Sequence, residues 1–288
     1  MYYCASMLRP NFDIVAPDWN ADLHGEYYLV IEVSDRLFSF VLLDSERKQL
    51  HCLRQYNFDW QQKTGLSEQL DSIIDNDPYL QANVKDVIIV YNYEESNLVP
   101  EGFFNLGLNK TLTELVFGKA KKGLVISEKI NNWSLYNVYR IPREVHTKMQ
   151  QRFSAGKYWH YYSLLLTSTP PSDGEAPVCT VIFYADRFIC FIANAGKLQL
   201  VQTWTYQTPE DVSYYLLAVC SRFQYNQETI HIRVGGLIDE QSALYTELMK
   251  YFLVVTLVSV PASMETNELL REFPSHYFSP LLTIATCV

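Results

Sequence analysis

The chain has 288 residues, of which 48% are hydrophobic and 14% aromatic, a composition typical of globular proteins that excludes general disorder. The formal net charge of −9, from 23 basic and 32 acidic residues, makes nucleic acids and anionic membranes poor partners unless the chain carries a local basic patch. The length allows one large domain or two medium ones, each able to bury its own core.

Secretion, membrane insertion and metal binding find no support in the sequence. Residues 1–19 lack the basic region and apolar core of a secretory signal. The apolar run Tyr251–Val260 is shorter than the roughly 20 residues that span a bilayer, so we expect a buried strand there. The six cysteines form no Cys-x-x-Cys pair and have no histidine at metal-ligand spacing. We therefore expect a reduced, cytoplasmic protein.

Taken in order, residues 1–25 are expected to be an irregular lead-in, and residues 26–167 a first lobe. Alternating apolar and polar residues between turn residues indicate an antiparallel meander, and a 3.6-residue apolar period indicates the helix that follows it. The expected elements are strands at Tyr28–Val33, within Asp35–Val41 and at Gln49–Phe58, a helix at Ser67–Asp75 and a strand at Asp86–Tyr91.

The first lobe is expected to carry an insertion at about 93–167, which opens with a loop over Asn92–Gly107. Its predicted elements are a helix at Leu112–Phe117, strands at Gly123–Lys129 and Ser134–Ile141 joined by a two-residue turn at Asn131-Asn132, a helix over Arg143–Phe153 with Pro142 at its first position, and a Tyr/Trp/Leu-rich strand at Lys157–Thr167. Residues 168–177, which contain the run Thr-Pro-Pro-Ser-Asp-Gly-Glu, are the clearest linker in the chain.

A second lobe at 178–260 follows, and then a tail at 261–288 that packs on the lobes. Turn chemistry at Asn194–Lys197 separates two of its strands. The expected elements are strands at Val178–Tyr184, Arg187–Ala193 and Leu198–Tyr206, a helix at Pro209–Phe223, a strand at Glu228–Arg233, a helical pattern at Glu240–Tyr251 and a short apolar end at Leu281–Val288.

The meander occurs twice. Asp35-Arg36-Leu37-Phe38-Ser39-Phe40-Val41 in the first lobe matches Asp186-Arg187-Phe188-Ile189-Cys190-Phe191-Ile192 in the second. The helix-opening residues Glu68 and Glu210 are separated by the same number of residues as Asp86 and Glu228, which open the next strands. A shared offset across a helix, a loop and a strand predicts a duplicated α/β fold with two lobes in the order β-β-β-α-β.

Two such units joined by a linker resemble the duplicated ribonuclease-H-like fold of the actin, hexokinase and heat-shock-ATPase superfamily. More narrowly, the chain is similar to an uncharacterised bacterial family, typical of bacteroidetes, with an actin-like ATPase fold and mixed sheets. The narrower resemblance rests on the run Asn137–Pro142 leading into a helix, on the second meander with its helix at 209–223, and on Ser279-Pro280-Leu281-Leu282 in the tail that closes at Cys287. Relatives with this fold include cytoplasmic scaffolds of cell division and of pilus or secretion machinery.

The resemblance implies a nucleotide site made by the first β-hairpin of each lobe, where a strand-end Asp orients Mg²⁺ and a Gly lets backbone N–H groups approach a phosphate. In the first lobe Glu32 stands at the Asp position and Ser34 at the Gly position. In the second, Phe183 replaces the carboxylate and Ala185 the glycine, with Asp186 on the turn. Because an apolar ring cannot hold hydrated Mg²⁺, we do not expect ATP hydrolysis.

The pair Gly235-Gly236, at the end of a predicted strand, resembles the adenosine-side glycine pair of actin-like proteins. The alternative is a strand-to-helix turn that needs a positive φ. The candidate residues of this vestigial nucleotide cleft are Glu32, Ser34, Asp35, Asp186, Gly235 and Gly236. We expect no catalytic residue, no metal ligand and no cofactor, with ATP and Mg²⁺ as the alternative.

Three other features have both a functional and a structural interpretation. The basic cluster within Lys119–Lys122 is expected to be a solvated turn rather than a binding patch. His160 could belong to a stacking site, but an aromatic strand edge is expected. The 21 tyrosines could mark a protein-binding face, although Tyr214 and Tyr215 lie on an amphipathic helix, where core packing is favoured.

The sequence therefore predicts a two-lobed α/β protein with an actin-like architecture and a degenerate nucleotide site. We expect a non-catalytic cytoplasmic protein that acts through an unknown protein partner or through self-association, without binding nucleic acid or inserting into a membrane. The alternative is a nucleotide-binding ATPase or sugar-kinase-like enzyme in which Glu32, Asp186 and the glycine pair meet in a cleft between the lobes.

Overall fold

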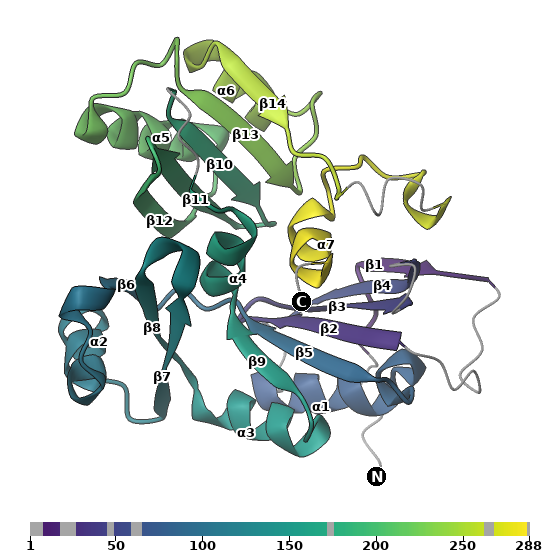
Figure 1. The fold of residues 1–288 in the computed structure, drawn as a ribbon. Helices are drawn as coiled ribbons and strands as arrows, with labels where there is room; N and C mark the ends of the chain where they lie inside the picture. The colour runs from purple at the N-terminus through teal and green to yellow at the C-terminus, as the bar shows by residue number, and fades with distance from the viewer. Residues whose placement is uncertain are drawn as a thin grey trace. The chain divides into compact units, whose positions relative to one another are not determined.

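The computed structural model describes residues 8–17, 27–44, 49–58, 65–171, 176–261 and 268–286. The chain divides into two compact units, Met1–Leu165 with Val288 and Leu166–Cys287 (Figure 1). Most of the predicted lead-in, the middle of the predicted linker, Cys4 and Cys287 lie outside the described residues. Cys52, Cys179, Cys190 and Cys220 are buried free thiols, as expected of cysteines in apolar elements.

The first unit is built on a six-stranded mixed sheet in the order β1-β4-β3-β2-β5-β9. Its strands are β1 (Phe12–Val15), β2 (Tyr27–Val33), β3 (Leu37–Asp44), β4 (Leu50–Asn57), β5 (Asp86–Tyr91) and β9 (Lys157–His160), and its helices α1 (Leu66–Asn76) and α3 (Arg143–Arg152). The first four strands pair antiparallel, whereas β2, β5 and β9 are parallel neighbours. Strand β1 lies within the predicted irregular lead-in, so that prediction is wrong for these residues.

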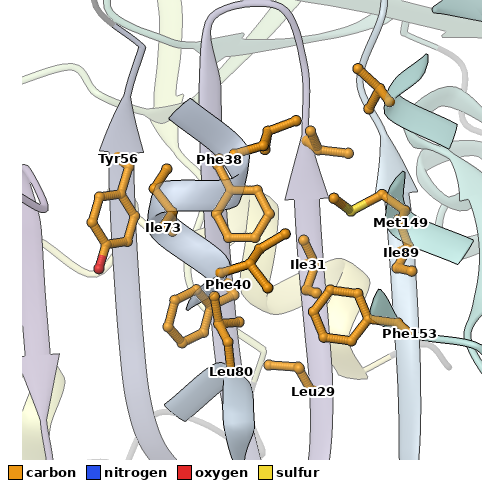
Figure 2. Close-up of a cluster of buried hydrophobic side chains, with 14 of the residues drawn as sticks. Leu29, Ile31, Phe38, Phe40, Tyr56, Ile73, Leu80, Ile89, Met149 and Phe153 are labelled. Carbon is orange, nitrogen blue, oxygen red and sulfur yellow. The ribbon is translucent and has the colours of Figure 1, made fainter. Parts of the chain in front are cut away.

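Helices α1 and α3 contribute to the core on one face of this sheet. Because strand side chains alternate between faces, Ile31 of β2 and Phe40 of β3 belong to this core and are fully buried. Figure 2 shows them in one cluster with Ile73 of α1 and Met149 of α3. The apolar period that predicts α1 therefore marks the face by which this helix packs.

Between β5 and β9 the chain adds a three-stranded antiparallel sheet in the order β6-β8-β7. Its elements are β6 (Ser96–Pro100), the 3₁₀ turns η2 (Glu101–Phe103) and η3 (Leu106–Leu108), helix α2 (Asn109–Phe117), β7 (Gly123–Ile130) and β8 (Leu135–Pro142). The predicted loop over Asn92–Gly107 thus contains a strand. The two-residue turn predicted at Asn131-Asn132 is also wrong, because a 3₁₀ turn over Asn131–Trp133 and Ser134 with φ of 50° join β7 to β8.

The second unit has a five-stranded mixed sheet in the order β12-β11-β10-β13-β14. Its elements are β10 (Val178–Phe183), β11 (Arg187–Asn194), β12 (Lys197–Thr205), α5 (Pro209–Phe223), β13 (His231–Gly236), α6 (Ala243–Tyr251), β14 (Val254–Leu257) and α7 (Ser279–Thr286). The predicted meander is confirmed, and its turn has positive φ at Ala195 and Gly196, as a tight hairpin turn requires. Helix α5 begins with a capping box between Thr208 and Asp211.

Both units contain the predicted β-β-β-α-β order, and each adds one more helix and parallel strand, α3 and β9 in the first and α6 and β14 in the second. The strand predicted at Tyr251–Val260 shrinks to β14, because its first residue still belongs to α6. Such four-residue strands are too short to produce a clear period in the sequence. The α/β fold class with mixed sheets is confirmed.

The predicted residue-by-residue match between the meanders is wrong by one position. The N–H of Ser34 donates to Leu37 O in one turn, and the N–H of Tyr184 donates to Arg187 O in the other, so Leu37 corresponds to Arg187 rather than to Phe188. This shift keeps Phe38 and Phe188 on the core faces of their sheets. A one-residue slip would turn every side chain of the strand to the opposite face.

The shared offset beyond the meander also fails. Tyr28 of β2 pairs with Asp86, and its counterpart Val178 of β10 pairs with His231. Asp86 therefore corresponds to His231 and not to Glu228, and the strand predicted at Glu228–Arg233 begins later. The duplication is present in the topology, but it cannot be aligned by one constant offset.

The strand predicted at Lys157–Thr167 is wrong beyond His160, because helix α4 (Tyr161–Ser168) follows β9 directly. His160 Nδ1 accepts the N–H of Tyr162 at 3.1 Å, and the carboxylate of Glu128 accepts the N–H of His160 at 3.1 Å. These acceptors serve N–H groups at the start of the helix, which have no partner within it. A short apolar run does not reveal by itself whether it forms a strand or a buried helix.

Candidate functional site

The turn between β2 and β3 is closed by its own serine. Ser34 is fully buried, and its Oγ accepts the N–H groups of Arg36 and Leu37, both at 3.0 Å. In a phosphate-binding turn, successive backbone N–H groups point at the anion. Here the Ser34 hydroxyl already accepts two such N–H groups. The residue at the expected glycine position therefore occupies the donors that would otherwise bind an anion.

Glu32 lies on β2, is 2% exposed, and accepts a hydrogen bond at 2.7 Å from the side-chain amide of Asn92. The N–H of Asn92 donates to Val33 O at 2.9 Å, which fixes this residue at the end of β5. Because strand side chains alternate, Glu32 points to the sheet face opposite to the core residues Ile31 and Val33. The carboxylate is thus held in place by the fold.

A cavity of about 430 Å³ opens beside Asp35 and is lined also by Glu94, Glu95, Lys122 and Arg140. Arg140 binds both carboxylate oxygens of Glu95, with 2.8 Å between Nη2 and Oε1, and donates to the carbonyls that end α2. Asp35 also pairs with Arg36, at 3.4 Å between Oδ2 and Nε, so the cavity is lined by charges of both signs that are partly paired. Such a lining does not favour an anionic phosphate.

The second hairpin carries no carboxylate at the position of Glu32. Glu32 pairs with Ser39 in β3, and the residue of β10 with the corresponding pairing to β11 is Ile182, opposite Ile189. The prediction that Phe183 replaces the carboxylate is therefore wrong in register, because Phe183 lies on the core face of its sheet. An apolar residue occupies the position in either alignment, and Asp186 lies in the following turn.

The two glycines at the end of β13 allow other segments of the second unit to pack closely against this strand. Gly236 has φ of +80°, and a Cβ there would lie 2.2 Å from Phe183 O, so no side chain fits. Gly235 does not have a positive φ, but a Cβ there would lie 3.1 Å from Ser279 Oγ at the start of α7. The N–H of Gly236 donates to His276 O at 2.8 Å. The positive φ expected of a turn glycine is thus present at Gly236 only.

The structure gathers the predicted residues into two groups. Glu32, Ser34 and Asp35 lie together at the end of β2 and in the turn after it, within the first unit. In the second unit, β10 and β13 are paired so that Gly236 lies opposite Phe183, close to the turn that contains Asp186. Within the described ranges, no group of three or more His, Cys, Asp or Glu side chains is placed to hold a metal ion.

A buried polar cluster that sequence reasoning missed joins β7, β8 and the start of α4. Glu128 accepts hydrogen bonds from the Tyr139 hydroxyl and the His160 N–H, and burial raises the pKa of Glu128. The His160 ring is held on both sides, since Nδ1 accepts the N–H of Tyr162 and Nε2 lies 2.9 Å from Tyr93 O.

These contacts require a neutral ring with its proton on Nε2, and burial lowers the pKa of His160 to about 4. The expected aromatic strand edge is present, since His160 ends β9 at the edge of the sheet, and the same residue also caps the helix that follows. Because histidine is not among the preferred capping residues, no local signal in the sequence marks this role.

The comparisons with solved structures show the fold. A crystal structure from Bacteroides thetaiotaomicron, of a protein with an actin-like ATPase fold and unknown function, is 20% identical, with a TM-score of 0.72 over 81% of this chain and 91% of that chain. The PilM–PilN type IV pilus biogenesis complex contains a chain that is 10% identical, with a TM-score of 0.60 over 91% of this chain and 98% of that chain. At these identities the likeness establishes the actin-like ATPase fold, as predicted, and nothing further.

No curated protein matches the chain. None of the described helices combines the length and apolar character that crossing a membrane requires. Residues 17–255 match the model of a family described as a protein of unknown function, DUF3822. The match spans well over half of the sequence, and it agrees with the predicted resemblance to an uncharacterised family. The chain belongs to this family.

Proposed function

We propose that this protein is a non-catalytic, cytoplasmic actin-like protein that works through contacts with other proteins. The observation that carries the proposal is the closed turn at Ser34, whose hydroxyl accepts the N–H groups of Arg36 and Leu37. The apolar residue Ile182 at the second carboxylate position points the same way. The N–H groups of Arg36 and Leu37 are already bonded in the first hairpin, and the second hairpin has no carboxylate at the matching position. An actin-like cleft built from them lacks the groups that bind phosphate and orient Mg²⁺.

Protein contact is supported by apolar side chains on the second unit. Tyr215 stacks on Trp204, with 5.1 Å between the ring centroids, and packs against the core, as predicted. The neighbouring Tyr214 is 69% exposed, contrary to the expected core packing. Met249, Tyr251 and Leu253, on and beside α6, are exposed as well. Aromatic residues and Met are enriched at protein interfaces, and the structurally similar PilM is seen in a complex with PilN.

One observation favours the alternative of a nucleotide-binding ATPase or sugar-kinase-like enzyme. Glu32 is a buried carboxylate held in one orientation by Asn92, which is how a Mg²⁺-orienting group would be supported. Asp186 would have to supply the second carboxylate from a turn. We consider the alternative weaker, because it leaves the contacts of Ser34 unexplained.

Calorimetric titration with ATP and ADP in the presence of Mg²⁺ decides between these functions. The proposal expects no binding at millimolar concentration for the wild type or for Glu32→Gln. Binding would overturn the expected absence of a working nucleotide site, and ATP turnover that Glu32→Gln removes would overturn the non-catalytic part of the proposal. Substitution of Gly236 is unsuitable as the test, because a Cβ there clashes with Phe183 O and a loss of binding would only report misfolding.

The protein-contact part needs its own experiment. Cross-linking in a cell lysate, followed by mass spectrometry, is expected to capture a protein whose yield falls when Tyr214 is replaced by Glu. Ser221→Glu, a change at another exposed position of α5, serves as the matched control. Equal yields from wild type and Tyr214→Glu would contradict the proposal that the surface around Tyr214 binds a protein partner.

A further inference from the structure

A short segment of the first unit exposes a series of large apolar side chains. The exposed residues on η2, η3 and α2 are Phe103, Leu106, Leu108, Leu115 and Val116, with 83% of Phe103 and 82% of Leu115 accessible to solvent. Leu108, Leu112 and Leu115 follow each other at i, i+4 and i+7, so they form one stripe along α2. The face with Asn109 and Thr113 is buried where α2 packs beside β7 and β8 (Figure 1). We call residues 101–117 the apolar ridge.

Cationic side chains follow the apolar ridge directly. Lys119, Lys121 and Lys122 are exposed in the connection from α2 to β7. Lys121 and Lys122 also line a hollow of about 420 Å³, together with Arg143 and Lys148 of α3. Lys148 is paired with Asp71, whereas the lysines of the connection have no ion-pair partner among the residues that the structure describes.

Several acidic side chains lie near these cations. Asp35, Glu94 and Glu95 line the cavity beside Lys122, where Asp35 is paired with Arg36 and Glu95 with Arg140. Glu101 pairs with Lys129 at 2.6 Å, and Glu114 pairs with Lys110 at 3.8 Å. Glu144 is the one acidic residue that lines the hollow. In a chain with a net charge of −9, this region therefore carries a local positive charge next to projecting apolar groups.

We propose that the apolar ridge and the cationic hollow dock this protein on a membrane surface that contains anionic phospholipids. Side chains as exposed as Phe103 and Leu115 project from the fold, which suits entry into the boundary between headgroups and acyl chains. Lys119, Lys121, Lys122 and Arg143 then bind headgroup phosphates. Apolar residues beside Lys and Arg are typical of surfaces that bind the interface of anionic membranes.

The net charge of the chain does not oppose this docking. At 0.1 M salt the Debye length is about 10 Å, so acidic residues further away are screened from the lipid surface. The docking is peripheral and needs no spanning helix. It goes beyond the proposed function, and it assigns a ligand to the basic cluster that the sequence alone predicts to be a solvated turn.

The test is sedimentation of the full chain with lipid vesicles. We expect binding to vesicles in which a third of the phosphatidylcholine is replaced by phosphatidylglycerol, no binding to pure phosphatidylcholine, and release as salt is raised. Each lysine near an anionic surface contributes about fivefold to partitioning, so Lys121→Gln with Lys122→Gln should weaken binding about 25-fold. Leu115→Glu should abolish binding, because it places a charge where the ridge enters the lipid.

Ser221→Glu is the control, since it adds the same charge at an exposed position of α5 in the second unit and should leave vesicle binding unchanged. Circular dichroism and thermal melts verify that each variant is folded. The proposal is overturned if the wild type binds neither vesicle, or if Ser221→Glu weakens binding as much as Leu115→Glu. Absence of vesicle binding together with dimerisation or peptide binding that Leu115→Glu removes would assign the ridge to a protein partner and would also overturn it.

Discussion

Replacing His160 by Asn should make folding stability less dependent on pH. In the wild type the neutral ring caps α4 through Nδ1 and contacts Tyr93 O through Nε2. An Asn side chain can still accept the N–H of Tyr162, because Asn is a favoured capping residue, but it does not titrate. The variant therefore retains the cap and removes the proton-binding group.

The magnitude follows from the pKa of His160, which burial lowers from 6.5 to about 4. Since the unfolded chain binds the proton more readily, the stability from this group is fully present above pH 6.5 and is lost progressively as the pH falls toward 4. The difference corresponds to about 3 kcal/mol. Glu128, whose pKa is raised, acts in the opposite direction, and this contribution is present in both proteins.

Urea unfolding at pH 7, 6, 5 and 4.5 measures the effect. The substitution His160→Asn is expected to cost about 1–3 kcal/mol at pH 7, since Tyr93 O loses its donor. The wild type should then lose more stability on acidification than the variant, so that the two curves converge. Parallel curves between pH 7 and 4.5, or a gap that widens with acid, would refute the assignment of His160 as a neutral helix cap.

Further substitutions test other parts of the structure. Gly236→Ala should lower stability by about 2 kcal/mol or more in thermal melts, because Gly236 has a positive φ and its backbone lies close to Phe183 O. Gly235→Ala should lower stability less, and equal losses for the two variants would contradict the geometry. Tyr215→Ala should cost about 2 kcal/mol in urea unfolding through lost packing, while Tyr214→Ala stays within about 0.5 kcal/mol. Arg140→Lys, which cannot form the two-pronged contact with Glu95, should speed proteolysis within 101–122, and unchanged cleavage would count against that anchor.

The sequence predicts the element types well where a segment has a clear period and local boundary signals. The meander of the second unit and helix α5, with Pro209 at its first position, illustrate this. The match between the two hairpins fails because the shared Asp-Arg dipeptide falls on different turn positions. The turn hydrogen bonds and the burial of alternate residues, as at Phe38 and Phe188, reveal the correct register.

Features that depend on distant residues could not be predicted. Helix α4 begins where it does because Glu128, far away in the chain, accepts the N–H of His160. The closed turn at Ser34 is local, because its Oγ accepts N–H groups two and three residues away, but it depends on hydroxyl orientation and burial, which the residue type alone does not give. The sequence therefore nominates residues for a candidate site, but it does not reveal the state of the backbone donors around Ser34.

The hydrogen bonds from Arg140 to the end of α2 determine how the insertion transmits force. The Arg140 guanidinium holds the end of α2, and its own strand, β8, passes directly into α3 at Arg143. Helix α3 is in turn anchored in the core by Met149, which is fully buried. A force applied to α2 is thus carried along a continuous, rigid path of strand and helix to the centre of the first unit, so that α2 and this core should move as one body under load.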